Sequence, residues 1–83
     1  MENILEKVKE VITKPMADID IVVDNIEYVK ENNYNFLKIT LDKPGGLDLD
    51  TIVQATEIIN PIMDEYDLIE EEYILDISSK ERG

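Results

Sequence analysis

The sequence predicts an α+β fold, a two-layer α/β sandwich in which two helices cover one face of a three-stranded sheet. Two segments, 4–16 and 52–63, repeat apolar residues every three or four positions, which is the spacing of an amphipathic helix. Three other segments, 19–31, 33–42 and 73–79, are rich in β-branched residues or alternate apolar with polar residues, as half-buried strands do. The predicted order is therefore helix, strand, strand, helix, strand.

The first helix is indicated by an apolar face on which charged residues do not fall. Asn3 is placed to cap the start of this helix. Pro15 lies inside the repeat, so the helix is predicted either to end near Lys14 or to continue with a kink to about Ala17. The apolar face consists of Ile4, Leu5, Val8, Val11, Ile12 and Met16.

A β-hairpin is predicted next. Its first strand, 19–31, is interrupted at Asp24 and Asn25. Glu31, Asn32 and Asn33 separate the two strands, and asparagine tolerates the positive φ of a tight turn. The second strand places one set of residues on a buried face and the other on an open face: Leu37, Ile39 and Leu41 against Phe36, Lys38 and Thr40.

The stretch ITLDKPGGLDLDTI, residues 39–52, raises the question of a ligand-binding loop. A phosphate loop needs a lysine and a hydroxyl residue directly after its last glycine, whereas here Lys43 precedes the glycines and acids follow them. An EF-hand counted from Asp48 would have Val53 at its glycine position and Ile59 at its glutamate position. Neither a nucleotide site nor a calcium site is expected.

The same stretch satisfies the requirements of a structural turn between a strand and a helix. Pro44 presets one corner, Gly45 and Gly46 accept a positive φ, and Asp48 or Asp50 caps the helix that follows. We therefore assign Pro44, Gly45, Gly46 and Asp48 a structural role.

The second helix is predicted to start at Asp48 or Asp50 and to bend or end at Pro61. An acidic connection, 64–72, leads to the third strand, 73–79. The domain is predicted to span 1–79, and 80–83 to form a frayed tail. The apolar face of this helix consists of Ile52, Ala55, Thr56, Ile59 and Met63.

A right-handed crossover after the hairpin favours the strand order 2-1-3, with the first strand in the centre. The residues expected in the core are Val8, Val11, Leu37, Ile39, Leu41, Ile52, Ile59, Leu75 and Ile77.

Composition excludes several functions. The 83 residues include no Cys and no His, so thiol or histidine nucleophiles and the usual zinc or haem ligands are absent. No apolar run is long enough to span a membrane, and no signal peptide is evident, so a cytoplasmic protein is expected. The carboxylates lack the apolar surroundings or partner groups that acid–base catalysis needs. We expect neither an enzyme nor a bound cofactor or metal.

Charge indicates the kind of partner. The net charge is −12, and no Lys or Arg occurs between Pro44 and Ser79. Such a chain repels nucleic acid and anionic lipid but attracts basic proteins. The predicted partner-binding residues are Asp64, Glu65, Asp67, Glu70, Glu71 and Glu72.

Three blocks of sequence, IEYVKE at 26–31, LKITLDKPGGLDLDTI at 37–52 and YILDISS at 73–79, resemble the N-terminal domain of the ribosome maturation factor RimP family. The resemblance covers nearly the whole chain. It implies a non-catalytic module, of the element order predicted above, that assists maturation of the small (30S) ribosomal subunit. The implied partner is a basic ribosomal protein, with no direct contact to nucleic acid. The alternative is a stand-alone acidic protein-interaction domain unrelated to ribosomes.

The chain also departs from the family pattern. Asp20 stands where the family tends to have Gly, and Asp24 where it tends to have an aliphatic residue. After Ser79 the usual Pro-Gly continuation is replaced by Lys80-Glu81-Arg82-Gly83. The family's second, SH3-like domain is therefore expected to be missing from this chain.

Overall fold

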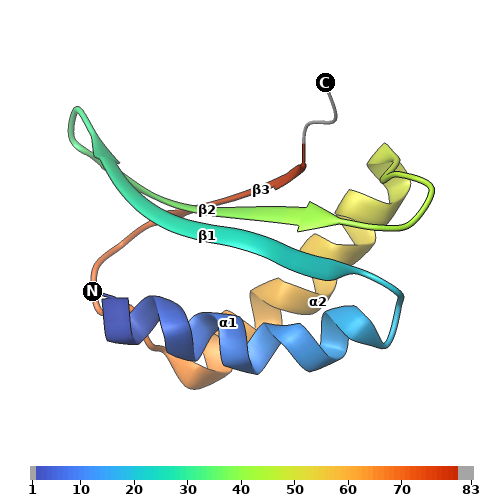
Figure 1. Cartoon of the computed structure of the whole chain (residues 1–83). Coiled ribbons are helices and arrows are strands. Elements are labelled where there is room, and N and C mark those ends of the chain that lie inside the picture. The colour runs from blue at the N-terminus through green and yellow to red at the C-terminus, as the bar shows by residue number, and fades with distance from the viewer. Residues whose placement is uncertain (1, 81–83) are drawn as a thin grey trace.

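The computed structural model describes residues 2–80 and confirms the predicted α+β architecture. Both helices lie on the same face of a three-stranded sheet, which gives two layers (Figure 1). The opposite sheet face carries Phe36, Lys38 and Thr40, which are partly exposed as predicted. The elements in chain order are α1 (Glu2–Ala17), β1 (Val22–Glu31), β2 (Tyr34–Asp42), α2 (Leu49–Tyr66) and β3 (Ile74–Ser79).

Helix α1 follows the longer of the two predicted alternatives. It continues through Pro15 to Ala17, and Met16 is fully buried. Proline here falls in the last turn, where one lost backbone hydrogen bond leaves the rest of the helix intact. The helix begins at Glu2, so Asn3 lies inside its first turn and the predicted capping role of Asn3 is wrong.

The link from α1 to β1 is a turn that the sequence analysis assigned to a strand. The backbone N–H of Ile21 donates to the carbonyl of Met16 at 2.8 Å, and Asp20 has a φ of 62°. This left-handed conformation ends the helix and buries Ile21 under the sheet. Strand β1 consequently starts at Val22 rather than at Ile19.

The hairpin is formed as predicted. Strands β1 and β2 are antiparallel, and Asn32 adopts a φ of 55° in the turn between them. The register shifts between Val23 and Asn25, so the interruption seen in the sequence is a β-bulge at Asp24.

The predicted strand order, 2-1-3, is wrong, because the sheet has the order β1-β2-β3. Strand β3 pairs in parallel with β2, the strand from which the α2 crossover starts. Two features suit β2 to the central place. Its inward residues Leu37, Ile39 and Leu41 are completely buried, whereas β1 carries the bulge and several exposed charges that are typical of an edge strand.

Helix α2 starts directly after Asp48, which was one of the two residues predicted to cap it. The helix runs through Pro61 to Tyr66. The predicted alternative in which the helix ends at Pro61 is wrong. Asp67 closes the helix in a left-handed conformation with a φ of 45°, and its backbone N–H donates to the carbonyl of Met63. The connection to β3 therefore begins three residues later than the predicted start at residue 64.

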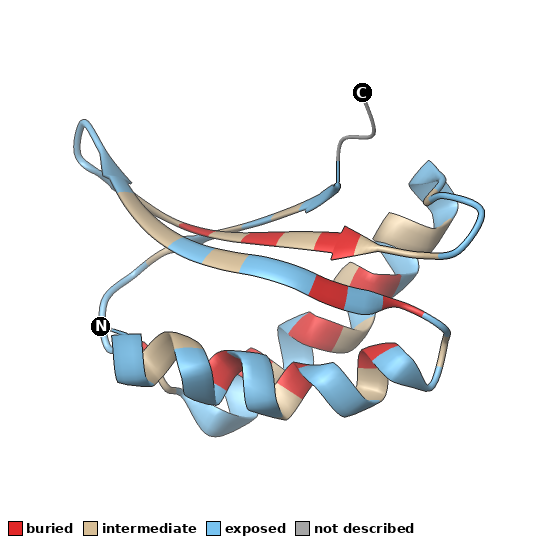
Figure 2. Cartoon of the chain, in the orientation of Figure 1, coloured by how far each residue is buried: buried red, intermediate tan, exposed pale blue. Residues whose placement is uncertain are grey.

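The core lies between the sheet and the two helices (Figure 2). Among the residues predicted for it, five are buried: Val8, Leu37, Ile39, Leu41 and Ile59. Val11, Leu75 and Ile77 are partly buried against it, and Ile52 is partly exposed. Ile69 was missed because it stands within a run of acids, yet it is only 5% exposed.

Lys80 adds a last contact to the sheet. Its backbone N–H donates to the carbonyl of Leu41 at 2.7 Å, and its Nζ lies 3.2 Å from Oδ1 of Asp24. The predicted frayed tail otherwise lies outside the described residues.

We predict that Ile39→Ala lowers the free energy of unfolding by about 2–5 kcal/mol, because it leaves a cavity at the centre of the core. Urea denaturation measures the change. Val53→Ala on the exposed side of α2 is the control and should change stability by less than about 0.5 kcal/mol. Equal stabilities of the two variants would contradict the placement of Ile39.

Candidate functional site

The Gly-Gly turn is built for backbone geometry. Gly45 and Gly46 have φ values of 85° and 94°, which glycine adopts without strain. A Cβ atom on either glycine would meet no heavy atom within 4 Å. The turn therefore requires glycine at these positions because of the left-handed backbone conformation. A side chain would not be excluded by neighbouring atoms.

The side chain of Asp48 is engaged by the start of α2. Its Oδ1 accepts hydrogen bonds from the backbone N–H of Thr51 at 2.8 Å and from the Thr51 hydroxyl at 2.6 Å. These two bonds, the one from the hydroxyl first, lower the pKa of Asp48 below its ordinary value of 3.8. Of the two predicted caps, Asp48 and Asp50, Asp48 is thus the one that caps the helix.

Within residues 2–80, no three or more acids are grouped so that they could hold a metal ion. None of the described helices is long and apolar enough to cross a membrane.

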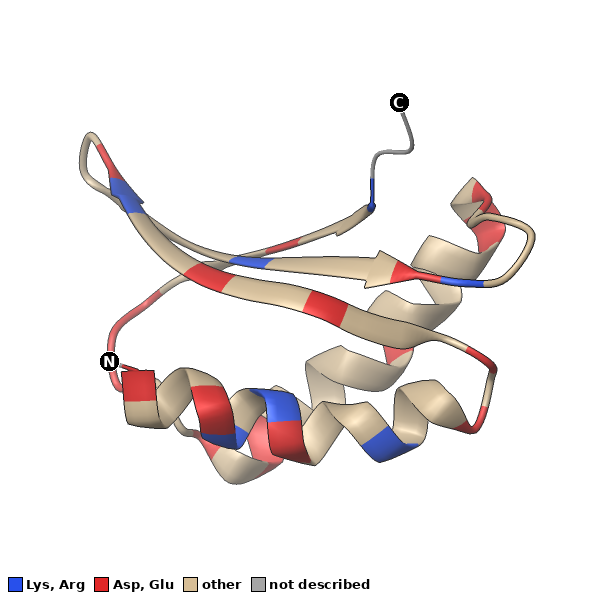
Figure 3. Ribbon diagram, viewed as in Figure 1, with Lys and Arg blue, Asp and Glu red and all other residues tan. Residues whose placement is uncertain are grey.

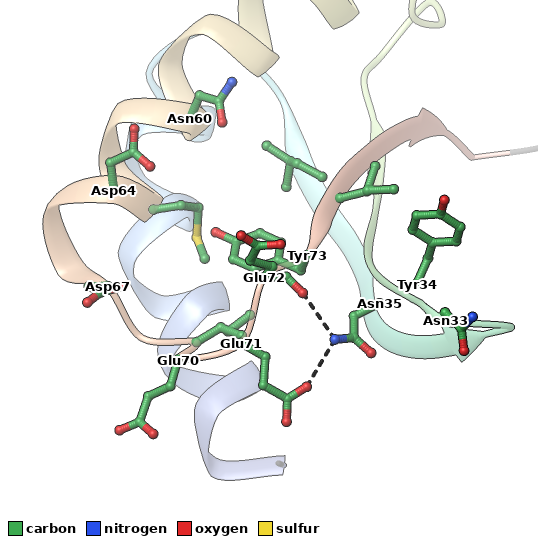
Figure 4. A pocket seen from close by; sticks show the side chains of 14 residues that line it. Asn33, Tyr34, Asn35, Asn60, Asp64, Asp67, Glu70, Glu71, Glu72 and Tyr73 are labelled. Atoms are coloured by element: carbon green, nitrogen blue, oxygen red, sulfur yellow. Dashed lines mark hydrogen bonds between the residues drawn. The ribbon is translucent and has the colours of Figure 1, made fainter.

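A cleft of about 800 Å³ lies between the second half of α2 and the start of β3. We call it the acidic cleft. Apolar atoms of Met63, Ile69 and Leu75 contribute to its lining. Figure 4 shows α2 on one side, the hairpin end on the other, and Glu72 and Tyr73 between them. The acids that line it are Asp64, Asp67, Glu70, Glu71 and Glu72.

Five of the six predicted partner-binding acids therefore meet at one place. Glu65 does not line the cleft, because it follows Asp64 on the helix and points in another direction. Figure 3 shows the acidic segment between α2 and β3 in the context of the whole chain.

Glu71 differs from the other acids of the cleft because it holds the connection to the hairpin. Its Oε2 accepts hydrogen bonds from Nδ2 of Asn35 at 3.0 Å and from the hydroxyl of Tyr28 at 3.2 Å. Nζ of Lys30 lies 3.7 Å from the same oxygen. Asn35 also donates to the backbone carbonyl of Glu72 at 3.0 Å (Figure 4). We call this set of contacts the Glu71 bridge.

The Glu71 bridge was not predicted. Its partners lie on β1 and β2, about forty positions away along the chain, and no local pattern connects them with three consecutive glutamates. Burial first, and then the hydrogen bond to Glu71, raise the pKa of Tyr28 above 10.0.

The remaining acids keep their charges available. Among residues 2–80, none of Asp64, Asp67, Glu70 and Glu72 takes part in an ion pair. Burial and then the charges of Asp64 and Asp67 raise the pKa of the Tyr73 hydroxyl. The negative potential of these two carboxylates thus reaches into the cleft.

We predict that Glu71→Ala destabilises the fold by roughly 1 kcal/mol, because Tyr28 and Asn35 lose a charged acceptor that is still about half exposed. Thermal unfolding measures the effect. Glu70→Ala removes a neighbouring charge without these bonds and should leave the melting temperature nearly unchanged. A Glu70 effect as large as that of Glu71 would contradict the bridge.

We predict that Asp48→Ala lowers the melting temperature at pH 7, because α2 loses its cap. The folded-state pKa of Asp48 is lowered, so its stabilisation is complete above 3.8 and is lost as the pH falls through the lowered pKa. The difference in melting temperature between wild type and Asp48→Ala should therefore become smaller below pH 4. Asp48→Asn, an uncharged cap, should lie closer to wild type than Asp48→Ala at pH 7, and a constant difference between wild type and Asp48→Ala would contradict the assignment.

A known protein family matches most of this chain. The model of the RimP N-terminal domain matches residues 9–80, which include most of α1, the whole sheet and α2. Two of the departures from that family's pattern, Asp20 and Asp24, have structural explanations here. Asp20 adopts a left-handed φ, which glycine accepts freely and aspartate tolerates. Asp24 lies in the β-bulge, where it pairs with Lys80.

Proposed function

The chain belongs to the RimP N-terminal domain family, a family of ribosome maturation factors, and we propose that it assists maturation of the small (30S) subunit without catalysing a reaction. In this proposal it acts in the cytoplasm as a binding module. The observation that carries the proposal is the acidic cleft, in which four acids have no ion-pair partner among residues 2–80.

The proposed partner is a basic protein of the small subunit. A surface with this charge repels RNA phosphates, so direct binding to ribosomal RNA would be opposed by the same acids that attract a basic protein. Unpaired charges at the edge of an interface act mainly on the association rate. The acidic cleft is therefore expected to raise the rate at which the domain associates with small subunits. This requires a subunit on which the surface of a basic protein is still exposed.

The support for a binding role also comes from the lining of the cleft. Its acids stand beside Ile74, which is exposed, and beside Tyr73 and Leu75, which are partly exposed. Such a mixture of apolar surface and peripheral charge is typical of protein-binding surfaces.

We predict that the domain binds purified small subunits and does not bind free ribosomal RNA. Binding should weaken steeply above about 0.15 M salt, where the screening length is about 8 Å. A variant with Asp64→Asn, Asp67→Asn and Glu72→Gln should associate more slowly, with a similar melting temperature. Glu71 is left unchanged in this variant because it stabilises the fold.

The measurement is surface-based association kinetics on immobilised subunits, with free RNA as the competing ligand. The control variant combines Glu6→Gln, Glu57→Gln and Glu65→Gln, which removes as many charges away from the cleft. Tight binding to RNA alone, or equal association rates of the two variants, would overturn the proposal.

A further inference from the structure

The outer edge of β3 presents backbone hydrogen-bonding groups that no described element uses. Strand β3, Ile74–Ser79, pairs with β2 on one side and is the last strand of the sheet. In a parallel pair, alternate residues turn their N–H and C=O groups away from the neighbouring strand. A six-residue strand thus offers about three residues whose backbone groups point outward.

The other edge of the sheet is far better protected. Strand β1 has a bulge at Asp24, and its exposed side chains include Glu27, Lys30 and Glu31. Bulges and charges are the usual devices that prevent an edge from pairing with another chain. Strand β3 has no bulge, and Asp76 is its one charged residue. The free edge that can accept a further strand is therefore that of β3.

The acidic cleft begins at this strand. Ile74 and Leu75 line it from β3, while Asp64 lines it from the last turn of α2 and Asp67 from the C-cap of that helix. Leu75 pairs with the fully buried Leu37, so its side chain is on the helix side of the sheet. An additional strand beside β3 would place alternate side chains on that same side, into the cleft (Figure 4).

The residues that line the cleft favour basic side chains on the added strand. Long basic side chains can lay their methylene groups against the partly exposed Tyr73 and Leu75 and bring their charged ends to Asp64 and Asp67. On the opposite sheet face, Asp76 would attract a basic residue of the added strand as well. A second copy of this chain is the wrong occupant, because each copy carries a net charge of −12 and the same acids at the edge.

We propose that the edge of β3 accepts an extended, lysine- or arginine-rich segment of the partner as a fourth strand, with alternate basic side chains in the acidic cleft. This inference rests on the proposed function, since it names the part of a basic ribosomal protein that the domain holds. Backbone pairing supplies affinity that does not depend on the partner's sequence, and the cleft supplies the preference for basic residues.

The test uses the full chain and an eight-residue peptide of alternating arginine and threonine. A second peptide has the same sequence and charge but N-methyl groups on its two central, adjacent residues. Adjacent residues donate from opposite edges of a strand, so this peptide cannot pair through its centre on either edge. We expect the first peptide to bind at least about tenfold more tightly than the methylated one, equivalent to about 1.4 kcal/mol.

Amide hydrogen exchange locates the bound peptide. Exchange at outward-facing amides of β3 should slow in the presence of the first peptide, while the exposed amides of β1 should not change. Equal affinities of the two peptides, or protection confined to residues outside β3, would overturn strand addition.

Matched variants test the cleft. Two double variants, Asp64→Asn with Asp67→Asn and Glu57→Gln with Glu65→Gln, each remove two charges from α2 or its C-cap. The first pair alone lines the cleft. Asparagine also accepts the left-handed conformation of position 67. The first variant should lose about tenfold in peptide affinity and the second less than about twofold. Equal losses would overturn the selection of basic side chains by the cleft.

The two proposals fail in different ways. If the domain binds small subunits but β3 shows no protection on them, strand addition is wrong and the proposed function stands. If the peptide binds at β3 while subunits do not bind at all, the edge is a binding site and the ribosomal role is wrong.

Discussion

The fold depends on one row of side chains, Leu37, Ile39 and Leu41 on the inner face of β2. All three are fully buried, with Val8 and Ile12 of α1 and Ala55 and Ile59 of α2 in the same core. In a three-stranded sheet, only the central strand can pair on both edges and be covered along its whole inner face. Once this row is fixed on β2, β1 and β3 must be edge strands, and each must meet the requirements of an edge.

Sequence patterns predicted the elements because each depends on neighbouring residues. The four-residue spacing of Val8, Ile12 and Met16 defines one face of a helix whatever lies opposite. Strand order depends instead on contacts between distant segments, and a preference for one crossover placed the wrong strand in the centre. The charges and interruption of β1 contained the information that would have marked it as an edge. Ile69 was missed for a related reason, since its burial depends on the fold and its neighbours in sequence are acids.

Most of the acids that line the candidate site could be predicted from the sequence. Which of them stabilises the fold and which remain without an ion pair could not. Three consecutive glutamates look equivalent in sequence, yet Glu71 is bonded to Tyr28 and Asn35 whereas Glu70 and Glu72 form no ion pair among residues 2–80. Similarly, Asp64 faces the cleft and the adjacent Glu65 does not, because successive helix residues point about 100° apart. Assigning these roles required the position of the hairpin, which approaches the connection only in the folded chain.

The division of roles among the acids has a physical logic that links stability to recognition. A connection with several unpaired carboxylates repels itself, and the Glu71 bridge opposes this repulsion by fixing the connection to Lys30, Tyr28 and Asn35. The acids that remain unpaired then stand in a defined position beside the edge of β3. At that position they act in two ways through one Coulomb interaction. They disfavour pairing between two copies of this acidic chain, which a free strand edge would otherwise invite, and they favour a basic strand at the same edge. Neutralising them would therefore weaken the selection for a basic partner and remove the protection against self-association together, because both follow from the same charges.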